Sequence, residues 1–97
     1  MVVIMYVIGV YDINTSDPEG NKRLRNILKL FRMYLHHVQK SVFEGELPES
    51  KYMELRKKTE KLIANKLDTV ILFKMNNPNW IKKDFLGYKE DITENII

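Results

Sequence analysis

The sequence predicts a single α+β domain in which two helices pack on one face of a small antiparallel sheet. Three observations support this fold class. The chain has 97 residues, which is enough for one compact domain and too few for two. Its hydrophobic content of 44% is sufficient to build a core. Apolar runs with strand character alternate with two amphipathic helical segments.

The first predicted strand covers residues 2–12, an apolar run that ends at Asp12. A run of this length is too short to span a bilayer, and it lacks the basic flank and the cleavage site of a secretion signal. A fully buried strand is the better interpretation, because the run is rich in β-branched residues. We therefore expect a cytoplasmic protein that has no association with a membrane.

The first predicted helix covers residues 18–35. Ser16 and Glu19 before it have the spacing of a capping box. Within the helix, apolar side chains fall on one broad face and basic side chains on the other, which is typical of a helix that covers a sheet.

Residues 36–47 carry β-branched and aromatic residues near a period of two. They predict either one strand or a bent strand that acts as two short ones around Glu44 and Gly45, and both interpretations are open at this point. Pro48 then suits the first turn of a second helix over residues 48–65.

Residues 68–75 form the last predicted strand, and a turn separates it from a segment with weak strand character. This order of elements predicts a ferredoxin-like βαββαβ sandwich. We assign residues 1–77 to this domain and residues 78–97 to a C-terminal tail. Because the tail has few partners of its own, we expect it to add an edge strand in a homodimer.

Composition excludes several classes of site. The chain has no cysteine, which excludes disulfides, cysteine-ligated zinc and thiol nucleophiles, and fits a reducing compartment. The sequence contains no glycine-rich phosphate loop, no serine nucleophile elbow, and no HExxH or EF-hand pattern. Its predicted strands lack the aromatic pattern of RRM-type RNA binding.

The net charge of +3 is unevenly distributed, because residues 20–43 contain no Asp or Glu. Four basic residues form one stripe on the first predicted helix: Lys22, Arg25, Lys29 and Arg32. From charge alone, this basic stripe is either solvated surface or a phosphate-binding surface. Arg23 lies off the stripe in the first helical turn, from which it could reach a phosphate at the end of the first strand.

Asp12 is either a turn-forming residue or a metal-binding carboxylate at the carboxyl end of the first strand. One carboxylate is too few for a metal cage made of protein alone. Mg²⁺, however, commonly takes one or two carboxylates and fills its shell with water and substrate phosphate. Two Asp12 side chains that meet across a dimer axis would supply such a pair.

Two segments resemble motifs of the CRISPR-associated protein two family. They are Tyr11-Asp12-Ile13 and the V-Q-x-S-V-F-E-G run of residues 38–45, with a basic helix between them. The likeness extends over about residues 2–75. It implies a ferredoxin-like homodimer that binds one Mg²⁺ ion between the two Asp12 side chains. It also implies metal-dependent endonuclease activity on single-stranded RNA or double-stranded DNA, and participation in spacer acquisition with the subunits of the CRISPR integrase.

The resemblance also implies the residues of the site. Asp12 would bind the metal, and four residues would complete the catalytic set: Tyr11, Arg23, Arg25 and Phe43. The nucleic-acid contacts would come from the basic stripe and from His37. The family usually carries Arg at the position of His37, and a histidine is mostly uncharged at neutral pH, so the chain departs from the family at this contact.

Two functional hypotheses follow. In the first, the chain is an Mg²⁺-dependent endonuclease whose paired Asp12 carboxylates hold the metal. In the second, it is a non-catalytic dimeric scaffold that bridges integrase subunits and binds DNA through the basic stripe, without a need for Asp12. A related toxin-type RNA-cleaving domain would differ from the first only in its cellular context.

Overall fold

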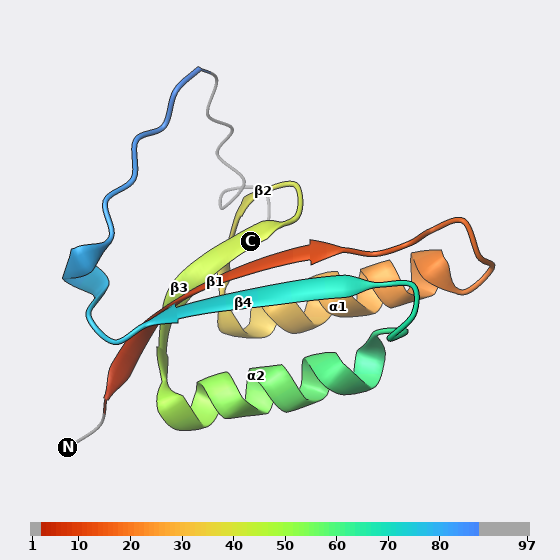
Figure 1. The fold of residues 1–97 in the computed structure, drawn as a ribbon, viewed down its shortest axis with the longest axis horizontal. Helices are drawn as coiled ribbons and strands as arrows, with labels where there is room; N and C mark the ends of the chain where they lie inside the picture. The colour runs from red at the N-terminus through yellow and green to blue at the C-terminus, as the bar shows by residue number, and fades with distance from the viewer. Residues whose placement is uncertain (1–2, 88–97) are drawn as a thin grey trace.

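The computed structural model describes residues 3–87 of the chain. The elements are β1 (Ile4–Asp12), α1 (Gly20–Tyr34), β2 (His36–Gln39), β3 (Val42–Pro48), α2 (Glu49–Leu62), β4 (Thr69–Met75) and the short 3₁₀ helix η1 (Pro78–Trp80). The strands form one sheet in the order β2-β3-β1-β4, and all neighbouring strands are antiparallel (Figure 1). The predicted ferredoxin-like α+β fold is confirmed.

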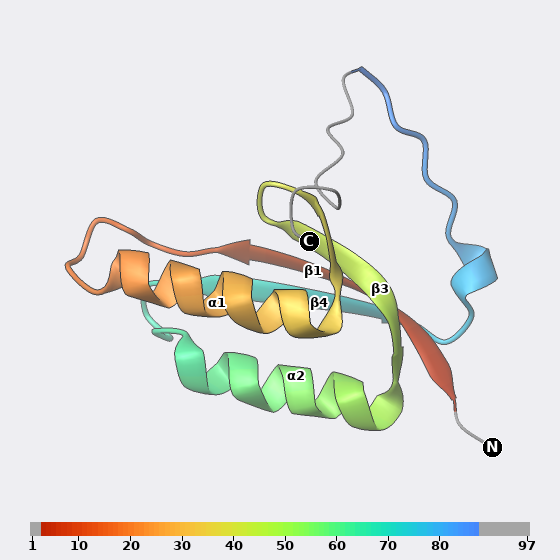
Figure 2. The ribbon, with the colours of Figure 1, turned by 180° about the vertical axis from the view of Figure 1, so that it is seen from behind.

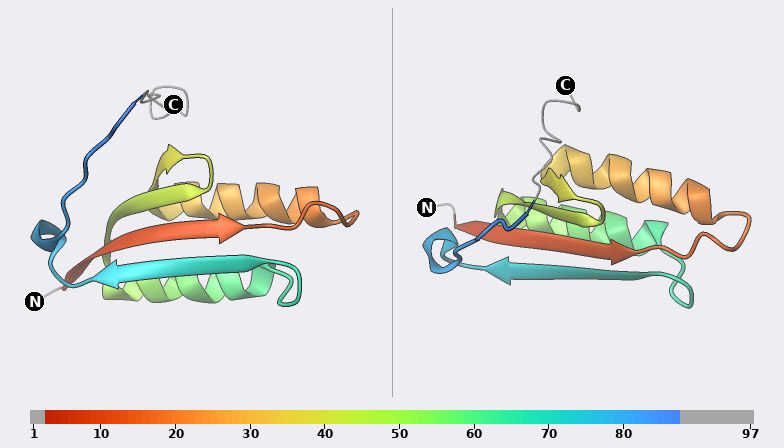
Figure 3. Two further views of the ribbon diagram at one scale, coloured as in Figure 1. Left: turned by 45° about the horizontal axis from the view of Figure 1, so that its top comes forward. Right: turned by 90° about the horizontal axis from the view of Figure 1, so that it is seen from above.

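Both helices cover the same face of the sheet. The view from behind shows α1 and α2 side by side and antiparallel (Figure 2). Seen from above, the sheet and the helices form two layers (Figure 3, right). The opposite face of the sheet, which we call the open face, is not covered by α1 or α2. Neither helix of residues 3–87 is long and apolar enough to cross a membrane.

The core lies between the sheet and the two helices. Side chains alternate along a strand, so Met5, Val7 and Tyr11 of β1 all point towards the helices, where they are buried. Phe31 of α1 and Phe43 of β3 meet there in a T-shaped contact with 5.4 Å between ring centroids. The even-numbered residues of β1, by the same alternation, point to the open face.

Gly9 allows α1 to approach β1 closely. A Cβ atom at this position would lie 2.8 Å from Cε2 of Phe31, which is closer than two carbon atoms pack. The glycine therefore makes room for the aromatic ring at the centre of the core.

The segment of residues 36–47 forms two strands, and the break between them differs from the predicted one. Glu44 and Gly45 lie inside β3, where they pair with Ile8 and Val7 of β1. The chain reverses before β3 instead, in a tight turn between β2 and β3. The expected division into two strands around Glu44 and Gly45 is therefore wrong, because both residues lie inside β3 and pair with β1.

The predicted capping box before α1 is also wrong. Glu19 occupies the N-cap position, and its side chain makes no capping hydrogen bond. The backbone N–H and the hydroxyl of Ser16 both donate to Oδ1 of Asn14, at 2.8 and 2.6 Å. Asn14 thus forms an Asx turn in the loop. Because the Ser16 hydroxyl is bonded to Asn14, it does not cap the helix.

The C-terminal tail is described only in part. Beyond η1, residues 81–87 form no strand and pass beside the open face, where Lys83 reaches Glu44 of β3. The edge strand expected of the tail falls partly on residues 88–97, which lie outside the described residues.

Candidate functional site

Asp12 is the last residue of β1, and its side chain is exposed on the open face. Within residues 3–87 its carboxylate forms no hydrogen bond or ion pair. It is therefore available to a ligand, in contrast to a turn-forming aspartate, whose carboxylate bonds to nearby backbone amides.

The open face next to Asp12 is apolar. The strand register places Ile71 of β4 opposite Val10 and Phe73 opposite Ile8. Both β4 side chains are exposed, Ile71 to 47% and Phe73 to 54%. An exposed apolar surface of this kind is typical of a protein interface.

Tyr11 and Phe43 lie in the core and not on the surface. Phe43 is fully buried, and the ring of Tyr11 packs against it and against Phe31. Burial raises the pKa of the Tyr11 hydroxyl, against the opposing effect of the nearby Arg32 charge. The Tyr11 hydroxyl donates to the backbone carbonyl of Lys40 at 3.2 Å. These two aromatic residues therefore support the end of β1 from the core side of the sheet.

Arg23 is held by two carboxylates. Its guanidinium pairs with Asp68 at 2.7 Å and with Asp17 at 2.8 Å, and it also donates to the carbonyl of Asn14. These contacts raise the pKa of Arg23. Burial alone would raise the pKa of Asp68, but hydrogen bonds from Arg23 and from the amides of Ala64 and Asn14 hold it below its usual range.

The Arg23 network thus joins the β1–α1 loop to the α2–β4 loop. Its side chain is committed to these contacts in the described chain, and the phosphate contact predicted for it stays a prediction.

The basic stripe is exposed along α1, and none of its members forms an ion pair with a described residue. The opposite face of α1 is buried through Ile27, Leu30 and Phe31. The stripe therefore lies on the helix side of the sheet, whereas Asp12 points to the open face. The structure does not bring Arg25 and Asp12 of one chain to the same face.

His37 is engaged both at the face of its ring and at the edge. The ring stacks on Phe43 with 4.3 Å between centroids and 2° between planes. Nε2 lies 2.6 Å from the carbonyl oxygen of Lys40, which can only accept, so Nε2 carries the proton. Nδ1 is buried and has no partner in the described part of the chain. The nucleic-acid contact predicted for His37 stays a prediction.

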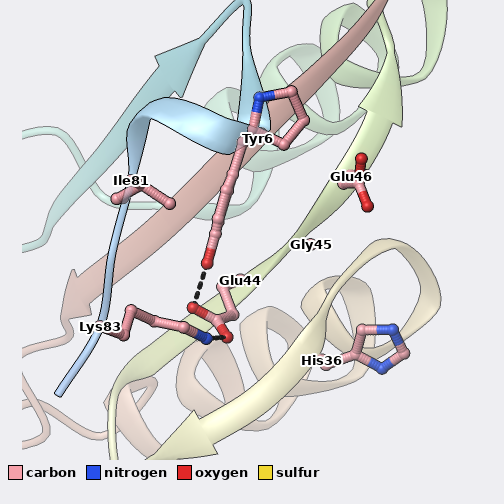
Figure 4. A pocket seen from close by; sticks show the side chains of 8 residues that line it. Tyr6, His36, Glu44, Gly45, Glu46, Ile81 and Lys83 are labelled. Carbon is pink, nitrogen blue, oxygen red and sulfur yellow. Dashed lines mark hydrogen bonds and ion pairs between the residues drawn. The ribbon is translucent and has the colours of Figure 1, made fainter.

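A second polar group lies on the open face and was not predicted. Tyr6, Glu44 and Lys83 line a pocket of about 470 Å³ together with residues of β2, β3 and the tail. Glu44 lies between the other two, accepting from the Tyr6 hydroxyl and pairing with Lys83 (Figure 4). Burial and the neighbouring Glu44 raise the pKa of Tyr6. This group fastens the start of the tail to the sheet.

Sequence reasoning also missed Asp68 and Lys40. The only sequence signal for Asp68 was its position at the start of a strand, which does not reveal a partner in a distant loop. The turn between β2 and β3 gave no glycine or asparagine signal, because Lys40 itself adopts the left-handed conformation with φ of 35°.

The described residues offer no group of three or more His, Asp or Glu side chains that could hold a metal ion. The described part of one chain therefore does not surround Asp12 with a cluster of three ligands, and its own contribution to a site there is the Asp12 carboxylate. Mg²⁺ sites with one or two carboxylates and several waters are common, so the donor set fits this ion when a second chain contributes its own Asp12.

Comparison with known proteins identifies close relatives. Residues 5–83 match the model of the family described as CRISPR associated protein Cas2. The chain is 44% identical over 93 residues to the CRISPR-associated endoribonuclease Cas2 of Fusobacterium nucleatum, covering 96% of this chain and 87% of that protein. It is 41% identical over 86 residues to the protein of the same name from Thermotoga maritima, covering 89% and 92% of the two chains.

Solved structures agree with these matches. A crystal structure of Cas2 superposes with a TM-score of 0.77 at 31% identity, covering 91% of this chain and 92% of that one. The structure of Streptococcus pyogenes Cas2 at pH 6.5 gives a TM-score of 0.69 at 30% identity, covering 82% and 99% of the two chains. The family match and the similarity to these relatives show that this chain belongs to the CRISPR-associated Cas2 family.

Proposed function

We propose that the chain is a metal-dependent endonuclease that hydrolyses phosphodiester bonds in single-stranded RNA or double-stranded DNA and takes part in spacer acquisition with the CRISPR integrase. The observation that supports this proposal most directly is the exposed carboxylate of Asp12 at the end of β1, which has no partner within residues 3–87. Relatives at 44% and 41% identity bear the name endoribonuclease, which supports RNA as a substrate.

The proposed active unit is a homodimer formed through the open face. Ile71 and Phe73 are exposed there, and water is excluded from them when a second copy packs against the same surface. Because Asp12 lies on this face, a two-fold axis near the end of β1 would bring two Asp12 side chains together. Each chain would then contribute half of the site.

In this dimer the two Asp12 carboxylates would hold one Mg²⁺ ion. When bound, the ion supplies Lewis-acid polarisation of a phosphate oxygen and a bound water of lowered pKa. Tyr11 and Phe43 keep the end of β1 in place from the core side. Arg23 holds the β1–α1 loop that follows Asp12, through its contacts with Asp17 and with Asp68, the residue before β4.

The test is cleavage by the Asp12→Asn variant, which keeps the side-chain shape and removes the charge. Mutation of residues that only support metal ligands lowers metal affinity or activity by about 10–100-fold. Loss of a ligand itself should therefore lower the cleavage rate by at least about 100-fold. Fluorescently labelled RNA and duplex DNA would be assayed with Mg²⁺ and with EDTA. Asp84→Asn, which removes an exposed carboxylate after β4, is the matched control. A repurified Asp12→Asn protein that cleaves like wild type would refute the nuclease proposal.

The alternative is a non-catalytic dimeric scaffold that binds DNA and bridges integrase subunits. The separation of the basic stripe from Asp12 favours it, because the stripe lies on the helix side and can contact a DNA backbone without the metal site. The two functions are compatible. The scaffold alone predicts that Asp12→Asn binds and bridges DNA as wild type does.

A further inference from the structure

The tip of the β2–β3 hairpin combines a strained backbone with an exposed positive charge. Lys40 has φ of 35°, in the left-handed region that side chains other than those of asparagine and aspartate rarely adopt. Glycine or asparagine would occupy this position at lower conformational cost. The side chain is exposed and forms no ion pair with a described residue. A two-residue hairpin turn requires such a backbone, so the conformation by itself belongs to the turn. Strained residues also concentrate at functional sites, and here the strained position carries an exposed charge.

Three hydrogen bonds hold this tip in place. The Lys40 carbonyl accepts one bond from the Tyr11 hydroxyl at 3.2 Å and one from Nε2 of His37 at 2.6 Å. The Ser41 carbonyl accepts from the backbone N–H of Tyr11 at 3.2 Å. His37 is itself fixed by its stack on Phe43. The turn is therefore anchored to the core, and its strained conformation is maintained by its neighbours.

The tip lies where the two separated parts of the candidate site approach each other. It follows β2, the edge strand of the sheet, and it is bonded to Tyr11, the residue next to Asp12. Arg32, at the end of the basic stripe, lies close enough for its charge to lower the pKa of the Tyr11 hydroxyl. The Lys40 turn thus lies beside the end of β1, which carries Asp12, and next to the edge strand of the sheet that separates the basic stripe from the open face.

We propose that Lys40 is a phosphate-binding residue that holds one backbone phosphate of the nucleic acid on its path from the basic stripe to Asp12. A lysine ammonium suits this role because it is a compact charge on a long stem, and the fixed backbone gives the stem a defined origin. The ligand chemistry is that of the phosphodiester backbone, which RNA and DNA share. This inference rests on the proposed function, since it assigns a residue to the same site.

The test measures binding separately from cleavage. Fluorescence anisotropy in EDTA, with labelled single-stranded RNA in one arm and duplex DNA in the other, gives the dissociation constant at several salt concentrations. The variants are Lys40→Asn, which removes the charge and tolerates the left-handed backbone, and Lys40→Arg, which keeps the charge. Lys57→Asn on α2 is the matched control, because Lys57 is exposed and also forms no ion pair with a described residue.

We expect Lys40→Asn to weaken binding about fivefold and to reduce the slope of log affinity against log salt by about 0.7 on single-stranded RNA or about 0.9 on duplex DNA, the change expected when one phosphate is no longer neutralised. Lys40→Arg and Lys57→Asn should keep the wild-type slope. The melting temperature of Lys40→Asn should equal or exceed that of wild type, because the strain is relieved. A structural role alone would lower the melting temperature and leave the slope unchanged.

The inference is overturned if Lys40→Asn keeps the wild-type affinity and slope on both nucleic acids, if Lys57→Asn weakens binding as much as Lys40→Asn, or if wild type binds neither nucleic acid. A slope change on either arm supports it and shows which backbone is bound. If Lys40→Asn binds with the reduced slope but no preparation cleaves, the nuclease proposal fails and this inference stands. If wild type cleaves and Lys40→Asn binds normally, the nuclease proposal stands and this inference fails.

Discussion

At the scale of single residues, Arg23 and Asp68 show how one ion pair can join loops that are far apart in the sequence. The Asp68 side chain has no exposed surface, and it accepts hydrogen bonds from Arg23 and from two backbone amides. Both carboxylate oxygens that burial removes from water are thereby paired, which is the condition under which a buried carboxylate can remain charged.

Replacement of Asp68 by Asn should destabilise the fold by about 3 kcal/mol, because it leaves the Arg23 charge without its buried partner. Urea unfolding followed by circular dichroism measures this loss. Asp17→Asn is the control, and we expect a smaller loss because Asp17 is more exposed. Equal losses in the two variants would show that the buried pair is not the dominant contact.

The same pair predicts an acid limit to stability. The pKa of Asp68 is lower in the folded chain than in the unfolded chain. Its contribution is therefore fully present above the unfolded pKa and is lost as the pH falls through the folded pKa. Stability of wild type should decrease below about pH 4, where unfolded aspartates take up protons. Asp68→Asn should lack this part of the decrease when urea unfolding is repeated across pH.

At the scale of elements, β1 and α1 each present two faces with different roles. Along β1, Tyr11 points into the core and Asp12 points to the open face, because side chains alternate. Along α1, the apolar face packs on the sheet and the basic stripe faces outward. Each element thus supports the core with one face and leaves the other exposed.

The outer face of α1 should bind nucleic acid through the phosphate backbone with little sequence preference. The double variant Lys22→Glu/Lys29→Glu should lower duplex affinity and reduce the salt slope by about 0.9 for each phosphate that the helix no longer neutralises. Lys51→Glu/Lys57→Glu on α2 makes the same charge change on the other helix and serves as the control. Unchanged duplex binding by the α1 variant would show that the basic stripe is solvated surface.

At the scale of the whole molecule, the distribution of exposed apolar side chains predicts the dimer. The helices cover one face of the sheet. Within residues 3–87, the segment after β4 lines pockets on the other face together with residues of β1, β2 and β3. Ile71 and Phe73 on β4 remain exposed among residues 3–87. A second copy that packs there would cover them. It would also bring the two Asp12 side chains to the interface, one from each chain.

Phe73→Glu should therefore convert the proposed dimer to a monomer and reduce cleavage in parallel, since the buried charge would oppose association. Size-exclusion chromatography with light scattering reports the mass, and the cleavage assay reports the site. Met33→Glu is the control, because Met33 is an exposed apolar residue on α1, on the helix side. A Phe73→Glu protein that remains dimeric would place the interface elsewhere.

Much of the fold could be predicted because it depends on local patterns. The alternation and the helical periodicity of apolar residues gave both helices and the strands within a few residues of their observed ends. The errors lie where side chains compete for partners: Asn14 engages Ser16 and prevents the capping box, and Lys40 forms the hairpin turn without a glycine. The outcome of such competition depends on the distances between these groups in the folded chain, and the sequence alone does not give those distances.

The sequence by itself determined the order of elements, the strand-end aspartate and the basic face of α1, because periodicity and charge are properties of neighbouring residues. Only the tertiary structure decided that Asp12 and the basic stripe lie on opposite sides of the sheet, that Arg23 is held by Asp17 and Asp68, and that the Lys40 turn is anchored to Tyr11 and His37. These relations join residues that lie far apart in the chain. They arise from the direction in which each side chain leaves its strand or helix once the sheet and the helices have packed.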